Sequence, residues 1–410
     1  MNSNWVTGAQ LSTSHSPQSE LTVERMTAAV LDMKAILPLD VAVVGAKEIP
    51  EIYLALTGPH RPAEQVVLWY DLLSDIPNME EPELVINWRG EKSHGWGGWS
   101  AVGSAVTETF RFACPNNPVV RAKTLARMRE LLRRYPFDGV FLDKIRFPSP
   151  ANGLEEVASC FCRHCQAAAS VVGLDLDTVR KVIEAKFAGA FVHQARAGAT
   201  DWLRSLLVPD SVLRQFVDFR LRTITGLVSE AAAEARALGR KVALDVFSPG
   251  LAPLVGQDYP ALAQVSDWIK PMTYRTAQGP AGLRLELSAL VAGAARMSGL
   301  HERDIAAWAA GHIRGCNKTS LSETRAKAVP LEIMTTEVGD AVRLAGSTPV
   351  YFGIEMVRQA GVIDIKPQHV RDMIGVGQRA GAAGTIVSWD LLHVPRENLV
   401  ALAESLPCRR

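Results

Sequence analysis

The chain has 410 residues, of which 48% are hydrophobic and 21% are charged, and its formal net charge is +1. This composition is typical of a globular protein and excludes a disordered or fibrous one. The balanced charge gives no basic face for a phosphate backbone, so we expect no nucleic-acid partner. No apolar run approaches the roughly 18–20 residues that cross a bilayer, and no basic residue precedes Arg25. We therefore expect a cytoplasmic protein without a membrane partner or secretory signal.

Residues 1–20 are rich in small polar side chains and show no apolar period, which predicts a flexible N-terminal arm. We expect residues 21–410 to form a single domain. In it, short β-branched or aromatic runs alternate with helical patterns. These predicted strands are residues 40–45, 66–71, 84–88, 139–143, 242–247, 268–274, 350–355 and 385–390. Near-continuous apolar runs of this kind are typical of parallel strands that are buried on both faces.

The segments between these runs carry helical patterns. Residues 119–135 and 211–238 place apolar side chains at helical spacing, and Gly239 is a stop signal after the second. Eight strands alternating with helices predict an α/β protein with a (β/α)8 TIM barrel, and an open doubly wound sheet is the alternative. Residues 151–236 are longer than one crossover helix needs, so we expect a helical insertion between strands 4 and 5 that carries a cysteine cluster.

Acidic and aromatic residues lie at the C-terminal ends of these predicted strands, where TIM barrels place their active sites. Hydrolysis of a glycosidic bond needs one carboxylic acid to protonate the leaving oxygen and a second carboxylate to attack or to activate water. Asp143, Asp245 and Glu355 are the candidate catalytic residues. Aromatic rings offer flat surfaces to sugars. The candidate substrate-binding residues are Asp71, Trp88, Arg146, Lys270, Tyr274, Trp389 and Asp390.

Some of these residues have a plausible structural role instead. An acid at a strand end can cap the following helix, and this alternative applies to Asp245 and Asp390. Lys270 could be the buried ion partner of a carboxylate. Sequence position alone does not separate these roles from substrate contact.

Four of the six cysteines form a candidate metal site. Cys160, Cys162 and Cys165 make a C-x-C-x-x-C run after the fourth predicted strand, and Cys114 precedes them. Six cysteines are too few for a disulfide scaffold in a chain of this length. Four thiolates around Zn²⁺ make a closed structural site. His164 and Cys316 are alternative ligands, and an iron–sulfur cluster is the alternative to zinc.

The cysteine pattern resembles the zinc site of the family 42 β-galactosidases, which are (β/α)8 barrel glycosidases. Residues 137–148, with Asp143 and Arg146, resemble the strand-four signature of glycosyl-hydrolase-like barrel proteins. The resemblance implies a retaining glycosidase with Asp143 as acid/base and Glu355 as nucleophile. The chain departs from family 42 because no Asn-Glu pair stands on strand four. Other barrel clans use a strand-four Asp as nucleophile with an acid from strand five or six, so Asp143 with Asp245 is the second pairing.

Together these patterns predict a glycoside hydrolase that acts on a carbohydrate or glycoside and carries a structural zinc ion. A barrel that binds a saccharide or metabolite without cleaving it is the alternative. Because family 42 relatives assemble, the helical insertion could serve a homo-oligomer interface.

Overall fold

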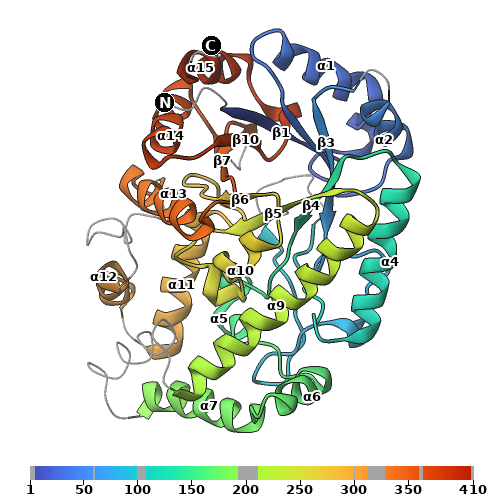
Figure 1. The fold of residues 1–410 in the computed structure, drawn as a ribbon. Coiled ribbons are helices and arrows are strands. Elements are labelled where there is room, and N and C mark those ends of the chain that lie inside the picture. The colour runs from blue at the N-terminus through green and yellow to red at the C-terminus, as the bar shows by residue number, and fades with distance from the viewer. Residues whose placement is uncertain are drawn as a thin grey trace.

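Eight parallel strands form a barrel in the computed structural model, which describes residues 5–58, 61–98, 108–192, 211–299, 301–312, 328–359 and 363–407. Their order is β6-β5-β4-β3-β2-β1-β10-β7, and a parallel bridge between Ile269 and Val350 joins β6 to β7 (Figure 1). The strands are β1 (Val6–Ser12), β2 (Val41–Gly45), β3 (Gln65–Asp71), β4 (Gly139–Asp143), β5 (Lys241–Phe247), β6 (Trp268–Met272), β7 (Tyr351–Glu355) and β10 (Gly384–Ser388). The predicted (β/α)8 barrel is confirmed.

The first strand lies inside the segment that was predicted to be a flexible arm. β1 pairs with β2 from Gly8 opposite Val41 and with β10 from Val6 opposite Gly384. Its small and polar residues do not form the apolar run that indicates a buried strand. Close packing between neighbouring strands nevertheless requires small residues here. A Cβ atom at Gly8 would lie 2.4 Å from the Ile386 side chain. The prediction of a flexible arm over residues 1–20 is therefore wrong for β1.

Residues 84–88 do not form a barrel strand. They lie in the long connection between β3 and α4 (Pro118–Arg134) and make only isolated bridges, such as Leu84 to Ala113 and Asn87 to Ser159. Their apolar side chains are buried under this connection, which explains why the run resembled a strand. The prediction of a third strand at this position is wrong.

Helices surround the barrel in the expected alternation (Figure 1). In α4, Asn117 caps the first turn by accepting from the Val119 amide, and Val120, Met128 and Leu132 are buried at helical spacing. The other helices outside the insertion are α1 (Val23–Lys34), α2 (Pro50–Thr57), α9 (Ser211–Ala237), α10 (Tyr259–Gln264), α11 (Leu283–Ser298), α12 (Glu302–His312), α13 (Leu331–Ala345), α14 (Pro367–Ala380) and α15 (Arg396–Ser405). A small hairpin pairs β8 (Arg358–Gln359) with β9 (Ile363–Asp364).

The segment between β4 and β5 is helical, as predicted. It contains η3 (Pro150–Asn152), α5 (Leu154–Val157), α6 (Arg163–Val171) and α7 (Leu176–Val192) before α9. Figure 1 shows α6 and α7 at the opposite end of the molecule from α14 and α15. Because α9 contacts both α4 and β5, it is the crossover helix of the barrel, and the added part is α5 to α7. Residues 193–210 lie outside the described ranges.

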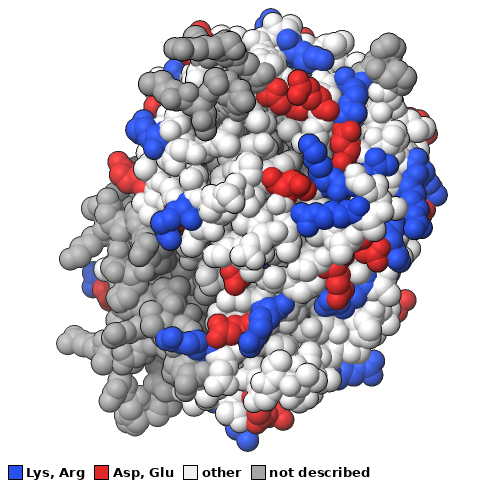
Figure 2. All heavy atoms as spheres, viewed as in Figure 1, with Lys and Arg blue, Asp and Glu red and all other residues white. Residues whose placement is uncertain are grey.

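The barrel interior is a packed apolar layer below the strand ends. It contains Val41, Val43, Val67, Trp69, Phe141, Ala243, Trp268 and Ile386. Within the described ranges, no helix is long and apolar enough to span a bilayer. On the face drawn in Figure 2, basic and acidic side chains are intermingled.

Candidate active site

Three aspartates form a row at the C-terminal ends of adjacent strands. Asp71 pairs with Asp143 in the β3–β4 ladder, and the β4–β5 register runs to Leu142 opposite Leu244, one residue before Asp143 and Asp245. Side chains two residues apart on a strand share a face. Trp69, Phe141 and Ala243 fill the barrel interior, so the three aspartates form the next layer toward the mouth.

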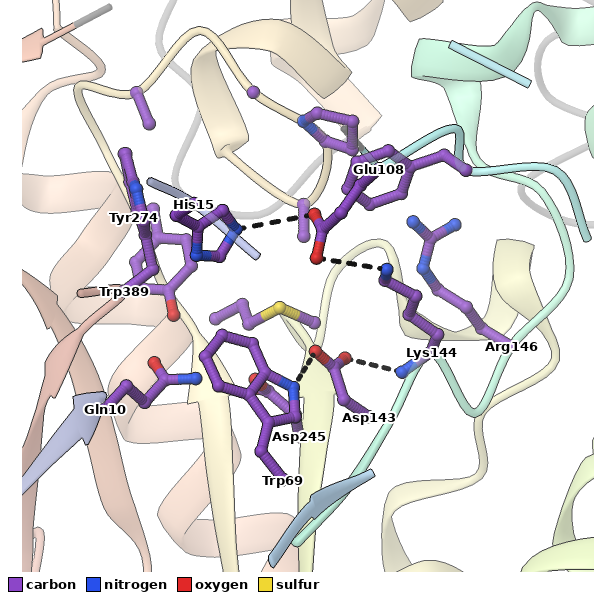
Figure 3. A pocket seen from close by; sticks show the side chains of 16 residues that line it. Gln10, His15, Trp69, Glu108, Asp143, Lys144, Arg146, Asp245, Tyr274 and Trp389 are labelled. Carbon is purple, nitrogen blue, oxygen red and sulfur yellow. Dashed lines mark hydrogen bonds and ion pairs between the residues drawn. The ribbon is translucent and has the colours of Figure 1, made fainter. Parts of the chain in front are cut away.

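A narrow pocket of about 70 Å³ opens above this layer (Figure 3). Asp143 and Asp245 line it together with aromatic and basic side chains and the loop after β6. The full lining is Gln10, His15, Trp69, Glu108, Phe110, Asp143, Lys144, Arg146, Asp245, Met272, Tyr274, Ala277, Gly279, Pro280, Ala281 and Trp389. Five of the predicted site residues therefore meet in one pocket: Asp143, Asp245, Arg146, Tyr274 and Trp389.

Asp143 is held in place by two N–H donors. The Trp69 indole donates to Oδ2 at 2.9 Å, and the Lys144 amide donates to Oδ1 at 2.5 Å. Lys144 adopts φ +52°, an unusual value for a residue other than glycine, directly after the strand. The orientation of the Asp143 carboxylate is therefore fixed by the Trp69 indole and the Lys144 amide.

Asp245 has a different environment. Its Oδ2 lies 2.7 Å from the Lys270 ammonium, which also donates to Gln10 at 3.0 Å. The Asp245 Oδ1 atom is buried and has no hydrogen-bond partner. Burial raises the pKa of Asp245 to about 7, although Lys270 opposes the shift. Near neutral pH this carboxyl group can therefore carry a proton.

Sequence analysis missed a second group of charged residues on one side of the pocket. The Lys144 ammonium lies 2.9 Å from Asp71, 2.8 Å from Asp75 and 3.3 Å from Glu108. The other Glu108 oxygen lies 3.4 Å from His15 Nε2 (Figure 3). Burial would raise the pKa of Glu108, but Lys144 and His15 lower it below its ordinary value. No sequence signal marks these residues. Asp75 and Glu108 belong to the β3–α4 connection, and they come close to Lys144 only in the folded chain.

Aromatic rings form another wall of the pocket. The rings of Tyr274 and Trp389 meet edge to face, with centroids 6.1 Å apart. The Trp389 indole nitrogen is buried without a hydrogen-bond partner. Arg146 lies between the rings of Phe112 and Phe247, at 4.4 and 4.6 Å, and burial lowers its pKa to about 10. These contacts fix one cation and two aromatic surfaces at the pocket.

Glu355 does not take part in the pocket. Its carboxylate accepts hydrogen bonds from the main-chain amides of Arg275, Thr276 and Ala277, at 2.5–3.2 Å. Its side chain is completely buried and does not line the pocket. The loop after β6 directs its amides at Glu355, so this residue anchors the loop. The structure therefore places Asp143, but not Glu355, in the lining of this pocket.

Four predicted substrate-binding residues also lie outside the pocket lining. Lys270 is the buried ion partner of Asp245, and Asp71 binds Lys144. Burial raises the pKa of Asp71 against the effect of Lys144.

The other two predicted substrate-binding residues, Asp390 and Trp88, contact structural elements outside the pocket. Asp390 caps η5 (Leu391–His393) by accepting from the Leu392 amide at 3.2 Å. Burial raises the pKa of Asp390 to about 6. Trp88 lies in the β3–α4 connection, where the Arg89 guanidinium covers its ring at 4.7 Å. The capping alternative therefore applies to Asp390.

The four predicted cysteine ligands come together away from the pocket. The Sγ atoms of Cys114, Cys160, Cys162 and Cys165 all lie within 4.8 Å of one another, and no disulfide joins them. The Ile86 amide donates to Cys160 Sγ at 3.3 Å, as does the Asn116 side chain to Cys165 Sγ. Such donors suit thiolates that bind a metal. The donor set thus fits a tetrahedral metal ion. His164 is not part of the group, and Cys316 lies outside the described residues.

Comparison with known proteins identifies the fold. No family model matches the chain, and no curated protein matches it. The PgaB (BpsB) glycoside hydrolase domain from Bordetella bronchiseptica is similar, with a TM-score of 0.57 and 13% identity over 98% of this chain and 100% of that one. The β-amylase catalytic domain from Paenibacillus polymyxa has a TM-score of 0.52 and 8% identity over 97% and 95% of the two chains.

A third solved structure is matched over only part of its length. Alpha-L-fucosidase isoenzyme 2 from Paenibacillus thiaminolyticus matches with a TM-score of 0.50 and 11% identity, over 99% of this chain and 49% of that one. At these identities the comparisons establish a shared barrel fold.

Proposed function

We propose that this chain is a glycoside hydrolase in which Asp143 and Asp245 are the catalytic carboxyl groups. The observation that carries the proposal is their placement at matching positions of neighbouring strands, in one pocket but in different environments. Glycosidic cleavage needs two carboxyl groups at one site, one that donates a proton and one that attacks or activates water. The similar barrels are a glycoside hydrolase domain, a β-amylase and a fucosidase, which supports the same class.

The two aspartates take different roles. Asp245, with its pKa raised to about 7, donates a proton to the leaving oxygen through its unpaired Oδ1. Asp143, oriented by the Trp69 and Lys144 N–H groups, attacks the anomeric carbon. Neighbouring strands lie about 4.8 Å apart, which favours the short carboxyl separation of retaining enzymes over the roughly 6.5–9.5 Å of inverting ones. The reaction is therefore retaining.

The pocket supports recognition of a sugar at its narrow end. Trp389 offers an indole face and an unpaired N–H, and His15 has an unpaired Nδ1 atom. Both buried groups can pair with hydroxyl groups of a ligand.

A panel of α- and β-linked nitrophenyl glycosides tests this proposal, with Asp143→Asn and Asp245→Asn as variants. We expect hydrolysis of at least one glycoside by the wild type and a loss of about 10²- to 10⁴-fold in each variant, with unchanged circular dichroism. A barrel that only binds saccharides would show ligand-dependent shifts in melting temperature without hydrolysis. Equal hydrolysis by the wild type and both variants would overturn the assignment.

We also propose that the four cysteines hold a structural Zn²⁺ ion. Four sulfur ligands leave no open position for chemistry at the metal. The site joins the β3–α4 connection, which carries Cys114 and Glu108, to the start of the insertion. Free thiolates persist in reducing compartments, so this site agrees with a cytoplasmic location.

A further inference from the structure

Arg220 is a buried cation on α9 close to the cysteine cluster. Its side chain is only 3% exposed. The guanidinium lies over the ring of Phe147 at 4.5 Å and near the ring of Phe216 at 5.7 Å. Its Nε and Nη2 atoms are buried without a hydrogen-bond partner. Within the described ranges, no carboxylate forms an ion pair with it. The helix lies against the cluster, because the ring of Phe216 is 5.3 Å from that of Phe161, which stands between Cys160 and Cys162. The Asn116 side chain also donates to both Cys165 Sγ and the Thr223 hydroxyl of α9.

An isolated buried charge is strongly unfavourable unless an opposite charge lies nearby. Ring contacts stabilise a buried cation by less than its desolvation costs. Four protonated thiols are neutral and would leave Arg220 uncompensated. Four thiolates around one divalent metal ion carry a net charge of −2, which would compensate it.

We propose that Arg220 is the counter-cation of a metal tetrathiolate formed by Cys114, Cys160, Cys162 and Cys165. Its charge stabilises the metal-bound cluster and slows release of the metal. The inference concerns the metal site and does not depend on hydrolase activity. It also explains why an arginine is tolerated at a buried, apolar position of a crossover helix.

Arg220 also links the cluster to the pocket. Its guanidinium packs on Phe147, whose carbonyl accepts from Arg146 at 3.1 Å, and Arg146 lines the pocket. A continuous chain of contacts therefore runs from Arg220 to the pocket. Arg220 itself is a positioning residue, because it does not line the pocket.

The experiment compares Arg220→Met and Arg220→Lys with the wild type. Arg222→Met is the matched control, because Arg222 is an exposed arginine on the same helix, α9. The proteins are loaded with Zn²⁺ alone, the bound zinc per chain is measured by elemental mass spectrometry, and its release to a colorimetric chelator is followed. Outer-shell partners typically change metal affinity by about 10- to 100-fold. We expect release from Arg220→Met to be faster by about this factor and release from Arg222→Met to match the wild type.

Arg220→Lys keeps the charge and should release zinc much more slowly than Arg220→Met. A melting experiment adds a second readout, because chelation leaves an uncompensated cation in the wild type and none in Arg220→Met. The fall in melting temperature on chelation should therefore be larger in the wild type. Equal release from the wild type and Arg220→Met, equal release from the Lys and Met variants, or absence of metal binding at four cysteines would overturn the proposal. If Arg220→Met does not fold, the Lys variant against Arg220→Gln makes the same comparison.

Discussion

Substitution of Glu355 distinguishes most clearly between the two candidate catalytic pairs, Asp143 with Glu355 and Asp143 with Asp245. The account makes Glu355 an anchor of the loop after β6, with three main-chain amides donating to its carboxylate. Each hydrogen bond to a charged group contributes about 1.5–3 kcal/mol. Burial offsets part of this gain, because it raises the pKa of Glu355 above its ordinary value. We therefore expect Glu355→Ala to lower the free energy of unfolding by roughly 4–6 kcal/mol.

Glu355→Gln is the more informative variant because it keeps one acceptor oxygen. We expect a loss of roughly 2–3 kcal/mol in unfolding free energy and hydrolysis within a few-fold of the wild type. Urea denaturation followed by tryptophan fluorescence measures the first quantity, and initial rates on the best glycoside of the panel measure the second. Glu184→Gln, on the exposed side of α7, is the control. Wild-type stability with a hundredfold or greater loss of hydrolysis in Glu355→Gln would refute the anchor role.

Two further predictions concern pH. Because Asp245 must be protonated to act as the acid, kcat/KM should fall as pH rises through about 7, and Asp245→Asn should abolish this limb in a pH–rate profile. For Asp390, burial raises the pKa from 3.8 to about 6, so the folded state holds the proton more tightly and stability falls as pH rises between these values. Asp390→Asn keeps an acceptor for the Leu392 amide, and its stability does not fall with pH in this way because the amide does not titrate. It should therefore be more stable than the wild type by up to about 3 kcal/mol above pH 6 and not below pH 4. Equal urea midpoints of the two proteins at pH 8 would contradict this.

The sequence predicted the features that depend on local patterns. The strands β2 to β7 and β10 are β-branched or aromatic runs, Asp143 ends one of these runs, and Cys160 begins a C-x-C-x-x-C pattern. β1 was missed because the barrel interior requires Gly8 and other small residues there. Residues 84–88 were misassigned because a buried connection needs apolar side chains as much as a strand does.

The roles of individual acids were harder to predict because they depend on distant parts of the chain. A strand-end position tells which mouth of the barrel a carboxylate faces, and this was correct for Asp143 and Asp245. It does not tell which donors surround the carboxylate. The amides that bind Glu355 are about 80 residues away in sequence, and Glu108 and His15 meet across 93 residues that include β2 and β3.

Covalent trapping tests the paired-aspartate mechanism most directly. The wild-type protein would be incubated with 2-fluoro glycosides that carry an activated leaving group, and the labelled peptide would be mapped by mass spectrometry. The account predicts a single adduct on Asp143, formed faster than in Asp245→Asn when the leaving group needs protonation. An adduct on Glu355, or steady hydrolysis of the parent glycoside with inverted stereochemistry and no adduct, would contradict it.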